Sequence, residues 1–217
     1  MPVSRITAKL MFPPVESAEP DGLLAYGGDL SAERLLLAYR EGIFPWYNEP
    51  PILWWSPDPR FVLFPNELQV AASMKQVLKK NLFTITFNQD FPGVIAGCKE
   101  VYRPGQDGTW ITNEVEAAYT RLHKDGWAHS VECWMDGKLA GGFYGVQLGK
   151  CFFGESMFAR VSNASKAAFI TFVQHAAKEG IEIIDCQVYT DHLASFGARF
   201  ITRKDFIDII KKNIISS

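Results

Sequence analysis

The sequence predicts an α+β protein in which helices cover a mixed β-sheet and a small N-terminal α/β lobe precedes it. The second half of the chain reads as three strands, a helix, a strand, a short helix, a strand and a final helix. The first sixty residues are instead rich in proline, glycine and aromatics, and the composition changes near residues 100–128. The length of 217 residues suits one large or two small domains, and such a chain can bury about 70% of its unfolded surface.

The first helix predicted from the sequence begins after Ser31, a favoured N-cap residue. Its apolar residues Leu35, Ala38 and Tyr39 fall on one face, and Gly42 is a typical helix stop. We therefore expect one amphipathic helix in the N-terminal lobe.

The segment 43–60 combines prolines at positions 45, 50, 51, 57 and 59 with tryptophans at positions 46, 54 and 55. The prolines exclude a regular helix and disfavour a central strand. Aromatic residues held in a stiff loop often form the wall of a binding site. A compact aromatic mini-core explains the same composition, and the two interpretations are compatible.

Hydrophobic periodicity predicts the elements in the middle of the chain. They are a helix over 71–80, a strand over 82–87 and a helix over 113–125, with Asn113 and Glu116 as a possible capping box and Gly126 as the stop.

In the second half, Asp136-Gly137 predicts a hairpin turn after a strand at 129–136. The elements that follow are strands at 139–147 and 150–158, a helix at 163–179 capped by Ser162 or Asn163, a buried strand at 181–188, a short helix at 191–196, a strand at 198–202 and a helix from 204.

Charge and motifs exclude several classes of function. The net charge of −2 gives no general attraction to nucleic acid, so any such contact must be local. The sequence has no dinucleotide-binding G-x-G-x-x-G, no phosphate loop and no G-x-S-x-G elbow. The four histidines lack metal-ligand spacing, and we expect the four cysteines to be buried, reduced thiols: Cys98, Cys133, Cys151 and Cys186. Without a signal peptide or membrane span, a cytoplasmic protein is expected.

Two carboxylates stand in unusually apolar strands. Asp185 ends a buried strand, with Gln187 two residues further along on the same side, and Glu155 interrupts an aromatic-rich strand. A carboxylate in such surroundings must be hydrogen-bonded, paired or neutralised. Functional sites tolerate this cost, but a buried carboxylate bonded only to backbone would give the same pattern.

Seven segments of unusual composition follow one another through about residues 12–206: Glu19–Ser31, Gly42–Trp46, Leu53–Arg60, Gly108–Thr112, Gly154–Phe158, Asn163–Lys166 and Ile184–Val188. This series resembles the bacterial leucyl/phenylalanyl-tRNA–protein transferases. The resemblance implies two domains, with a C-terminal lobe similar to the GNAT N-acyltransferase fold. We accordingly expect residues 1–62 and 63–110 to form the N-terminal lobe and 111–217 to form the GNAT-like catalytic lobe.

The resemblance also implies a reaction. Such enzymes move Leu, Phe or Met from aminoacyl-tRNA to the α-amino group of proteins beginning with Arg or Lys, and the product becomes a substrate for regulated proteolysis. The aminoacyl ester is already activated, so we expect no ATP, metal, cofactor or covalent nucleophile. One tRNA acceptor end per site makes a monomer sufficient.

By motif position, the resemblance implies that Asp185 and Gln187 form a relay that activates the incoming amine. Glu155 would orient the donor's amino acid or the incoming peptide. Trp46 and Trp110 would contact the terminal adenosine, where stacking can contribute roughly 1–3 kcal/mol.

The pocket for the transferred side chain is expected to contain Phe143, Phe152 and Met157, with Ser156 as a further substrate-binding candidate. Phe143 stands where Met is common in the family, which would shift the preference among Leu, Phe and Met. Phosphate contacts to tRNA are assigned to a set of lysines for which a solvated helix face is the alternative: Lys75, Lys79 and Lys80.

Two other classes fit parts of the sequence. An acetyl-CoA-dependent N-acetyltransferase would share the lobe, but residues 160–165 lack the glycine-rich loop that binds pyrophosphate before the long helix. A non-catalytic RNA-binding module would use the tryptophans and leave Asp185 and Glu155 unexplained. The resemblance favours the transferase.

Overall fold

The computed structural model describes residues 3–101 and 109–214, so Gly108 of the quoted motifs lies outside the described residues. The strands are β1 (Ser4–Ile6), β2 (Leu23–Gly27), β3 (Phe44–Pro45), β4 (Leu53–Trp55), β5 (Arg60–Leu63), β6 (Thr84–Phe87), β7 (Ala128–Met135), β8 (Lys138–Leu148), β9 (Cys151–Ala159), β10 (Ile183–Gln187) and β11 (Arg199–Ile201). The helices are α1 (Ala32–Arg40), α2 (Ala72–Lys79), α3 (Phe91–Glu100), α4 (Asn113–Lys124), α5 (Ala164–Lys178), α6 (Asp191–Ala194) and α7 (Arg203–Asn213).

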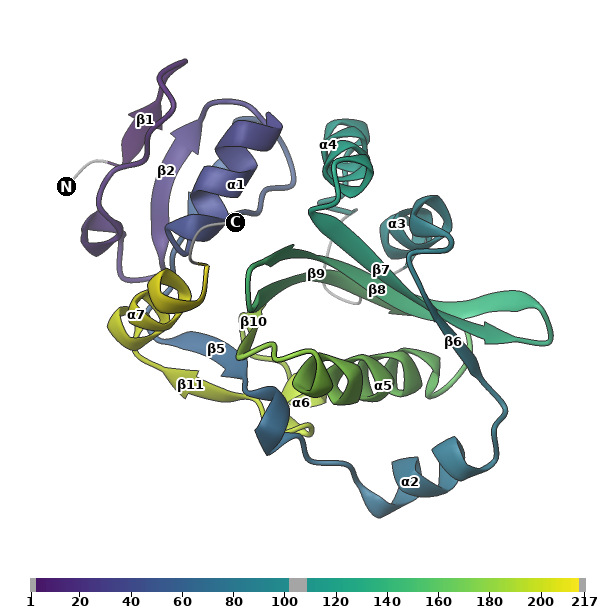
Figure 1. Cartoon of the computed structure of the whole chain (residues 1–217). Helices are drawn as coiled ribbons and strands as arrows, with labels where there is room; N and C mark the ends of the chain where they lie inside the picture. Colours follow the sequence, from purple (N-terminus) through teal and green to yellow (C-terminus); the bar gives the residue numbers. More distant parts are fainter. Residues whose placement is uncertain (1–2, 102–108, 215–217) are drawn as a thin grey trace.

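Within the described residues the strands form two sheets. The smaller has the order β1-β2-β4-β3 and the larger has the order β11-β5-β10-β9-β8-β7-β6. In the larger sheet β10 runs parallel to β9, and the other neighbours are antiparallel. Helix α5 covers one face of this sheet while α3 and α4 cover the other (Figure 1). The predicted α+β class is confirmed.

The N-terminal lobe is built around α1 and the small sheet. Ser31 caps α1 as predicted, because its side chain accepts a hydrogen bond from the Arg34 amide. Leu35, Ala38 and Tyr39 are buried on one face of the helix. The smaller sheet holds β3, which includes Pro45, and β4, which lies between Pro51 and Pro57.

The expectation that this segment would not supply a central strand is wrong in two places. Strand β4 lies between β2 and β3 in the smaller sheet, and the last residue of the segment belongs to a central strand of the larger sheet. Strand β5 begins at Arg60, directly after the last proline, and lies between β10 and β11 in the larger sheet. Both strands fall in stretches without proline: β4 lies between Pro51 and Pro57, and β5 starts directly after Pro59, so each keeps the amide donors that a central strand needs.

Two helix starts differ from prediction. The N-cap of α4 is Thr112, whose hydroxyl accepts from the Val115 amide, whereas Asn113 and Glu116 both accept from the Lys99 ammonium. The capping box was therefore a wrong assignment. Helix α5 follows Asn163, which adopts a left-handed conformation and makes no side-chain cap bond.

The remaining predicted elements of the second half are present. Asp136 and Gly137 both have positive φ, as a two-residue hairpin turn requires. Helix α3 was not predicted; it starts at the N-cap Asp90 and contains Gly93 and Gly97, which weaken the helical pattern. No helix in the described part of the chain has the length and apolar character needed to cross a bilayer.

The cysteine prediction holds with one correction. All four are free thiols, and Cys98, Cys133 and Cys151 are buried, but Cys186 is partly exposed. Its sulfhydryl lies at the end of β10, where the sheet opens onto a cavity.

The two lobes are joined by hydrogen bonds and by one core. Strands β5 and β6, which precede residue 110, pair with β10 and β7 of the larger sheet. Buried residues of the small sheet and of the large sheet, such as Trp54 and Phe153, belong to the same apolar cluster. The lobe boundary expected near residue 110 stays a prediction.

Candidate active site

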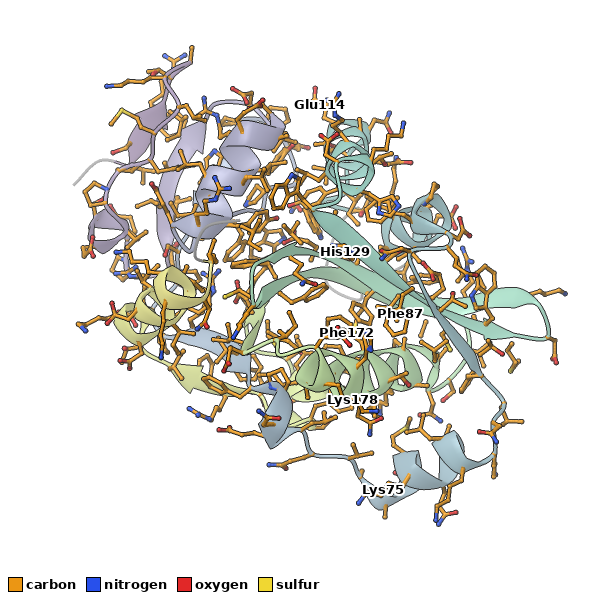
Figure 2. The ribbon with its side chains drawn as sticks, viewed as in Figure 1. Lys75, Phe87, Glu114, His129, Phe172 and Lys178 are labelled. Carbon is orange, nitrogen blue, oxygen red and sulfur yellow. The ribbon has the colours of Figure 1, made fainter. Side chains whose placement is uncertain are left out.

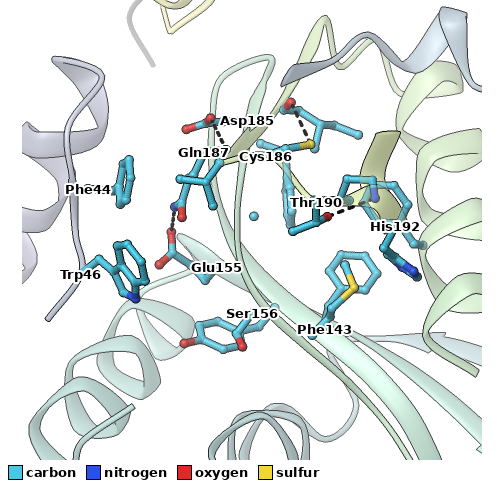
Figure 3. Close-up of a pocket in the computed structure, with 18 of the residues that line it drawn as sticks. Phe44, Trp46, Phe143, Glu155, Ser156, Asp185, Cys186, Gln187, Thr190 and His192 are labelled. Atoms are coloured by element: carbon cyan, nitrogen blue, oxygen red, sulfur yellow. Dashed lines mark hydrogen bonds between the residues drawn. The ribbon is translucent and has the colours of Figure 1, made fainter. Parts of the chain in front are cut away.

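A cavity of about 380 Å³ opens beside the end of β10, between the N-terminal lobe and the larger sheet (Figure 3). Its volume lies in the range of small-molecule sites. The structure brings together in its lining every catalytic and substrate-binding candidate from the sequence: Trp46, Trp110, Phe143, Phe152, Glu155, Ser156, Met157, Asp185 and Gln187.

One wall of the cavity is aromatic. The rings of Phe143 and Phe152 are arranged edge to face, with centroids 6.3 Å apart. Phe172 of α5 packs behind both, at 5.2 Å and 4.5 Å, and lies between the helix and the sheet (Figure 2). The sequence missed other apolar members of the lining, which come from α5, β10 and α6: Phe169, Ile184 and Leu193.

Tryptophans stand on the N-terminal side of the cavity. Trp46 is 39% exposed and packs against Trp55, whose indole N–H donates to the Trp46 carbonyl at 2.7 Å. Trp110 is 8% exposed. Together with Phe44, these rings give the cavity flat apolar surfaces opposite its polar side chains. Of the three tryptophans in the segment 43–60, Trp46 lines the cavity and Trp54 is fully buried, so the geometry is compatible with both the binding-wall and the mini-core interpretations.

Asp185 is held by an arginine from the neighbouring strand. The Arg60 Nε donates to Oδ1 at 2.8 Å and Nη2 donates to Oδ2 at 2.6 Å. Each of the two side chains is 1% exposed. The requirement that this buried carboxylate be paired is therefore met by a bidentate ion pair.

Gln187 departs from regular strand geometry. The pairing of β10 with β5 shifts register between Asp185 and Gln187, and Gln187 has a φ of +62°. Its amide N–H donates to Asp185 Oδ1 at 2.9 Å, and its side-chain amide donates to Glu155 Oε1 at 3.0 Å. The bulge therefore turns the Gln187 side chain toward Glu155 (Figure 3).

Glu155 lies at the centre of a hydrogen-bonded cluster. Tyr39 of α1 donates to Oε1 at 2.8 Å, and Tyr119 of α4 donates to Oε2 at 2.9 Å. Burial raises the pKa of Glu155 to about 8, and the nearby Asp185 charge acts in the same direction against the three hydrogen bonds. Burial also raises the pKa of both phenols well above the usual value. This carboxyl group can consequently gain or lose a proton near neutral pH.

Sequence reasoning found the carboxylates and missed their partners. Tyr39 was noted only as a helix-face residue, Tyr119 lies within the helix predicted over 113–125, and Arg60 was quoted only as the last residue of a motif. Each partner comes from a distant part of the chain, since Tyr39 and Glu155 are 116 residues apart and Arg60 and Asp185 are 125 apart.

The three lysines assigned to tRNA lie elsewhere. Lys75, Lys79 and Lys80 are exposed on and directly after α2, which packs on α5, and none lines the cavity. Figure 2 shows Lys75 on the outer side of α2. The structure leaves both the phosphate-binding and the solvated-face interpretations open.

Comparison with known proteins decides the family. The family model for leucyl/phenylalanyl-tRNA protein transferase matches residues 62–211, and the model for its N-terminal domain matches residues 28–58. The leucyl/phenylalanyl-tRNA–protein transferase of Syntrophobacter fumaroxidans is 57% identical over 215 residues, covering 99% of this chain and 92% of the relative. That of Syntrophus aciditrophicus is 55% identical over 215 residues, covering 99% and 90%. The chain belongs to this family.

Membership makes the chain an aminoacyltransferase, as the motif series predicted. Solved structures are more distant. A GCN5-related N-acetyltransferase from Kribbella flavida aligns with a TM-score of 0.38 and 12% identity, covering 77% of this chain and 60% of that one. L-PGS from Bacillus licheniformis aligns with a TM-score of 0.42 and 9% identity, covering 79% and 57%. Similarities of this size carry no argument about the site.

Proposed function

We propose that this enzyme transfers Leu, Phe or Met from aminoacyl-tRNA to the α-amino group of proteins that begin with Arg or Lys. The observation that carries the proposal is the cavity itself, in which an aromatic pocket, two tryptophans and a proton-accepting carboxyl group converge. The family name specifies Leu-tRNA and Phe-tRNA as donors. The proposal adds Met as a donor and an N-terminal Arg or Lys as the acceptor.

The donor end would occupy the aromatic side of the cavity. The Leu, Phe or Met side chain enters among Phe143, Phe152 and Met157, and the terminal adenosine lies against Trp46 and Trp110. An apolar pocket distinguishes side chains differing by one methylene by only about 1–3 kcal/mol, which is consistent with several accepted donors. Ser156 lies beside Met157 and faces the ester.

The amine would be activated at the polar side. The α-amino nitrogen attacks the ester carbonyl carbon, an amide bond forms, and the bond to the ribose oxygen breaks. One proton leaves the nitrogen and one reaches the ribose oxygen. The side-chain nitrogen of Gln187 donates to Glu155, and the side-chain oxygen takes no part in that bond. The oxygen accepts a hydrogen bond from the incoming amine and so orients it.

Glu155 is the proton acceptor in this scheme. Its raised pKa matches the proton affinity of an N-terminal amine, and its carboxyl group lines the cavity next to Gln187. This role differs from the orienting role that the family resemblance suggested. Asp185 accepts from the buried Arg60 guanidinium on both oxygens and from the Gln187 amide on Oδ1, so its role is to hold Gln187 in place.

The tRNA body would approach along the outer surface of α2. Phosphate contacts from Lys75, Lys79 and Lys80 position the acceptor stem without reading its sequence. Because one acceptor end serves one cavity, a monomer is sufficient, and the reaction takes place in the cytoplasm, where charged tRNA is available.

The test is transfer of labelled Phe from Phe-tRNA to a peptide beginning with Arg, beside a matched peptide beginning with Ala. We expect labelling of the Arg peptide alone, with ATP absent and a chelator present, and loss of labelling in Glu155→Gln. Labelling of neither peptide, together with acetyl-CoA turnover in a parallel assay, would instead establish an N-acetyltransferase.

A further inference from the structure

Arg60 contacts residues from several distant parts of the chain. It belongs to β5, pairs with Asp185 of β10, and donates from Nη1 to the Gly42 carbonyl at 3.2 Å. Its guanidinium carbon lies 4.7 Å from the ring centroids of both Phe44 and Phe206. A charged side chain this deeply buried, with each guanidinium nitrogen donating a hydrogen bond and two aromatic rings against it, has one fixed orientation.

We propose that Arg60 is a positioning residue of the transfer reaction, which acts through Asp185 to hold Gln187 in the orientation that receives the amine. The inference rests on the proposed function, because it assigns a role within that reaction. Arg60 itself does not line the cavity, whereas Asp185 and Gln187 do.

The hydrogen bonds around Asp185 support a positioning role for Arg60. Oδ1 accepts from both Arg60 Nε and the Gln187 amide, and Oδ2 accepts from Arg60 Nη2. Gln187 adopts a left-handed backbone conformation, which is unfavourable for any residue other than glycine. The bond from its amide to Asp185 offsets that preference, and the guanidinium fork keeps the carboxylate oriented to accept it.

Lysine cannot replace this fork. An ammonium group is a point charge, whereas the guanidinium offers parallel donors that match a carboxylate and a planar face that stacks on rings. The stack also matters for the cavity, because Phe44 is one of its lining residues and Phe206 belongs to α7. Arg60 therefore links the orientation of Gln187 to the cavity wall and to the C-terminal helix.

The main test compares Arg60→Lys with a matched variant, Arg34→Lys. Arg34 is equally buried and pairs with Asp29, which is 53% exposed, and it does not line the cavity. Phe transfer to the Arg peptide is measured for kcat and for the KM of each substrate, with thermal unfolding recorded alongside. We expect Arg60→Lys to lower kcat at least about ten-fold with the Phe-tRNA KM within about three-fold, and Arg34→Lys to change kcat less than about two-fold at a comparable loss of stability.

A double variant tests the route through Asp185. If Arg60 acts through that carboxylate, kcat of Arg60→Lys with Asp185→Asn stays within about three-fold of Asp185→Asn alone. Multiplying losses would overturn the proposal. Should Arg60→Lys fail to fold, Phe206→Leu leaves the ion pair intact and removes one stacked ring, and a kcat loss of about three-fold at an unchanged Phe-tRNA KM is expected.

The outcomes separate the two proposals. A wild-type enzyme that transfers no Phe overturns both. A wild-type enzyme that transfers Phe, with kcat unchanged in Arg60→Lys or in a folded Phe206→Leu, overturns only the role of Arg60.

Discussion

At the residue scale, the proposed role of Glu155 rests on its protonation. Two tyrosines from different helices and one glutamine donate to this carboxyl group, and burial opposes their effect on its pKa. A proton acceptor is most useful when its pKa lies near the working pH. The local environment therefore gives an ordinary side chain the proton affinity that the proposed amine activation requires.

The pH dependence of transfer follows from this carboxyl group. Only the ionised form accepts a proton, so kcat rises with pH through the Glu155 pKa of about 8. Tyr39→Phe removes a hydrogen bond that lowers this pKa, so the midpoint should move to higher pH by about one unit. The profile is measured at saturating substrates with one peptide, so titration of its own amine cancels in the comparison. Tyr26→Phe, on β2, is the control, and equal midpoints in all three proteins would contradict the assignment.

Phe143, which we assign to donor choice, contacts three other aromatic rings of the pocket wall. Phe143→Met nearly conserves volume but replaces a rigid ring with a flexible chain. We expect the ratio of kcat/KM values among Leu-, Phe- and Met-tRNA to change by about ten-fold, with unfolding free energy changed by less than about 1.5 kcal/mol. Competition among the three charged tRNAs measures the ratio, and an unchanged ratio would remove Phe143 from the specificity pocket.

At the scale of elements, local signals gave reliable helices and strands wherever the pattern was regular. The hairpin at Asp136-Gly137 and the helix after Ser31 follow from turn and cap chemistry that neighbouring residues determine. Strands β4 and β5 and helix α3 were missed because prolines lie next to the strands and glycines interrupt the helix. The carboxylates of the site were predictable because they conflict with their own strands, whereas Arg60 depends on a partner 125 residues away.

Helix α2 gives a prediction about tRNA binding. Its lysines are exposed, and each phosphate contact adds about 0.7–0.9 to the slope of log affinity against log salt concentration. Replacing Lys75, Lys79 and Lys80 with Ala should flatten the slope for Phe-tRNA by about two. The control replaces three exposed lysines of other elements, namely Lys138, Lys211 and Lys212. Equal slopes for the two triple variants would favour the solvated helix face.

Helix α3 packs closely on the sheet because Gly97 has no side chain. A Cβ at this position would lie 2.6 Å from the ring of the buried Phe158 on β9. Alanine favours the helix by about 1 kcal/mol over glycine, but overpacking costs about 1–3 kcal/mol. We expect Gly97→Ala to destabilise the protein in urea unfolding, and to stabilise it when Phe158→Leu has already removed the ring. Destabilisation in both backgrounds would show that the ring is not the cause.

For the molecule as a whole, the site depends on contacts between the lobes. Tyr39, Phe44 and Trp46 come from the N-terminal lobe, while Glu155 and Gln187 come from the larger sheet. The largest apolar cluster includes residues of both sheets and of α7. Neither lobe can therefore form the complete cavity alone.

This shared construction predicts that residues 111–217 do not fold alone, although they include most of the larger sheet. Strand β5 lies between β10 and β11, so its removal exposes one edge of β10 and leaves β11 without its partner. We expect the fragment 111–217 to give an NMR spectrum with little amide dispersion.

A longer fragment, 60–217, keeps β5 and β6 and should show more dispersion, yet no Phe transfer, because Trp46 and Tyr39 are missing. In the full chain, tryptophan fluorescence and far-ultraviolet circular dichroism should report one coincident urea transition. A well-dispersed spectrum from 111–217 would mean that the catalytic lobe is stable without the strand that carries Arg60, and that the N-terminal lobe adds only substrate contacts.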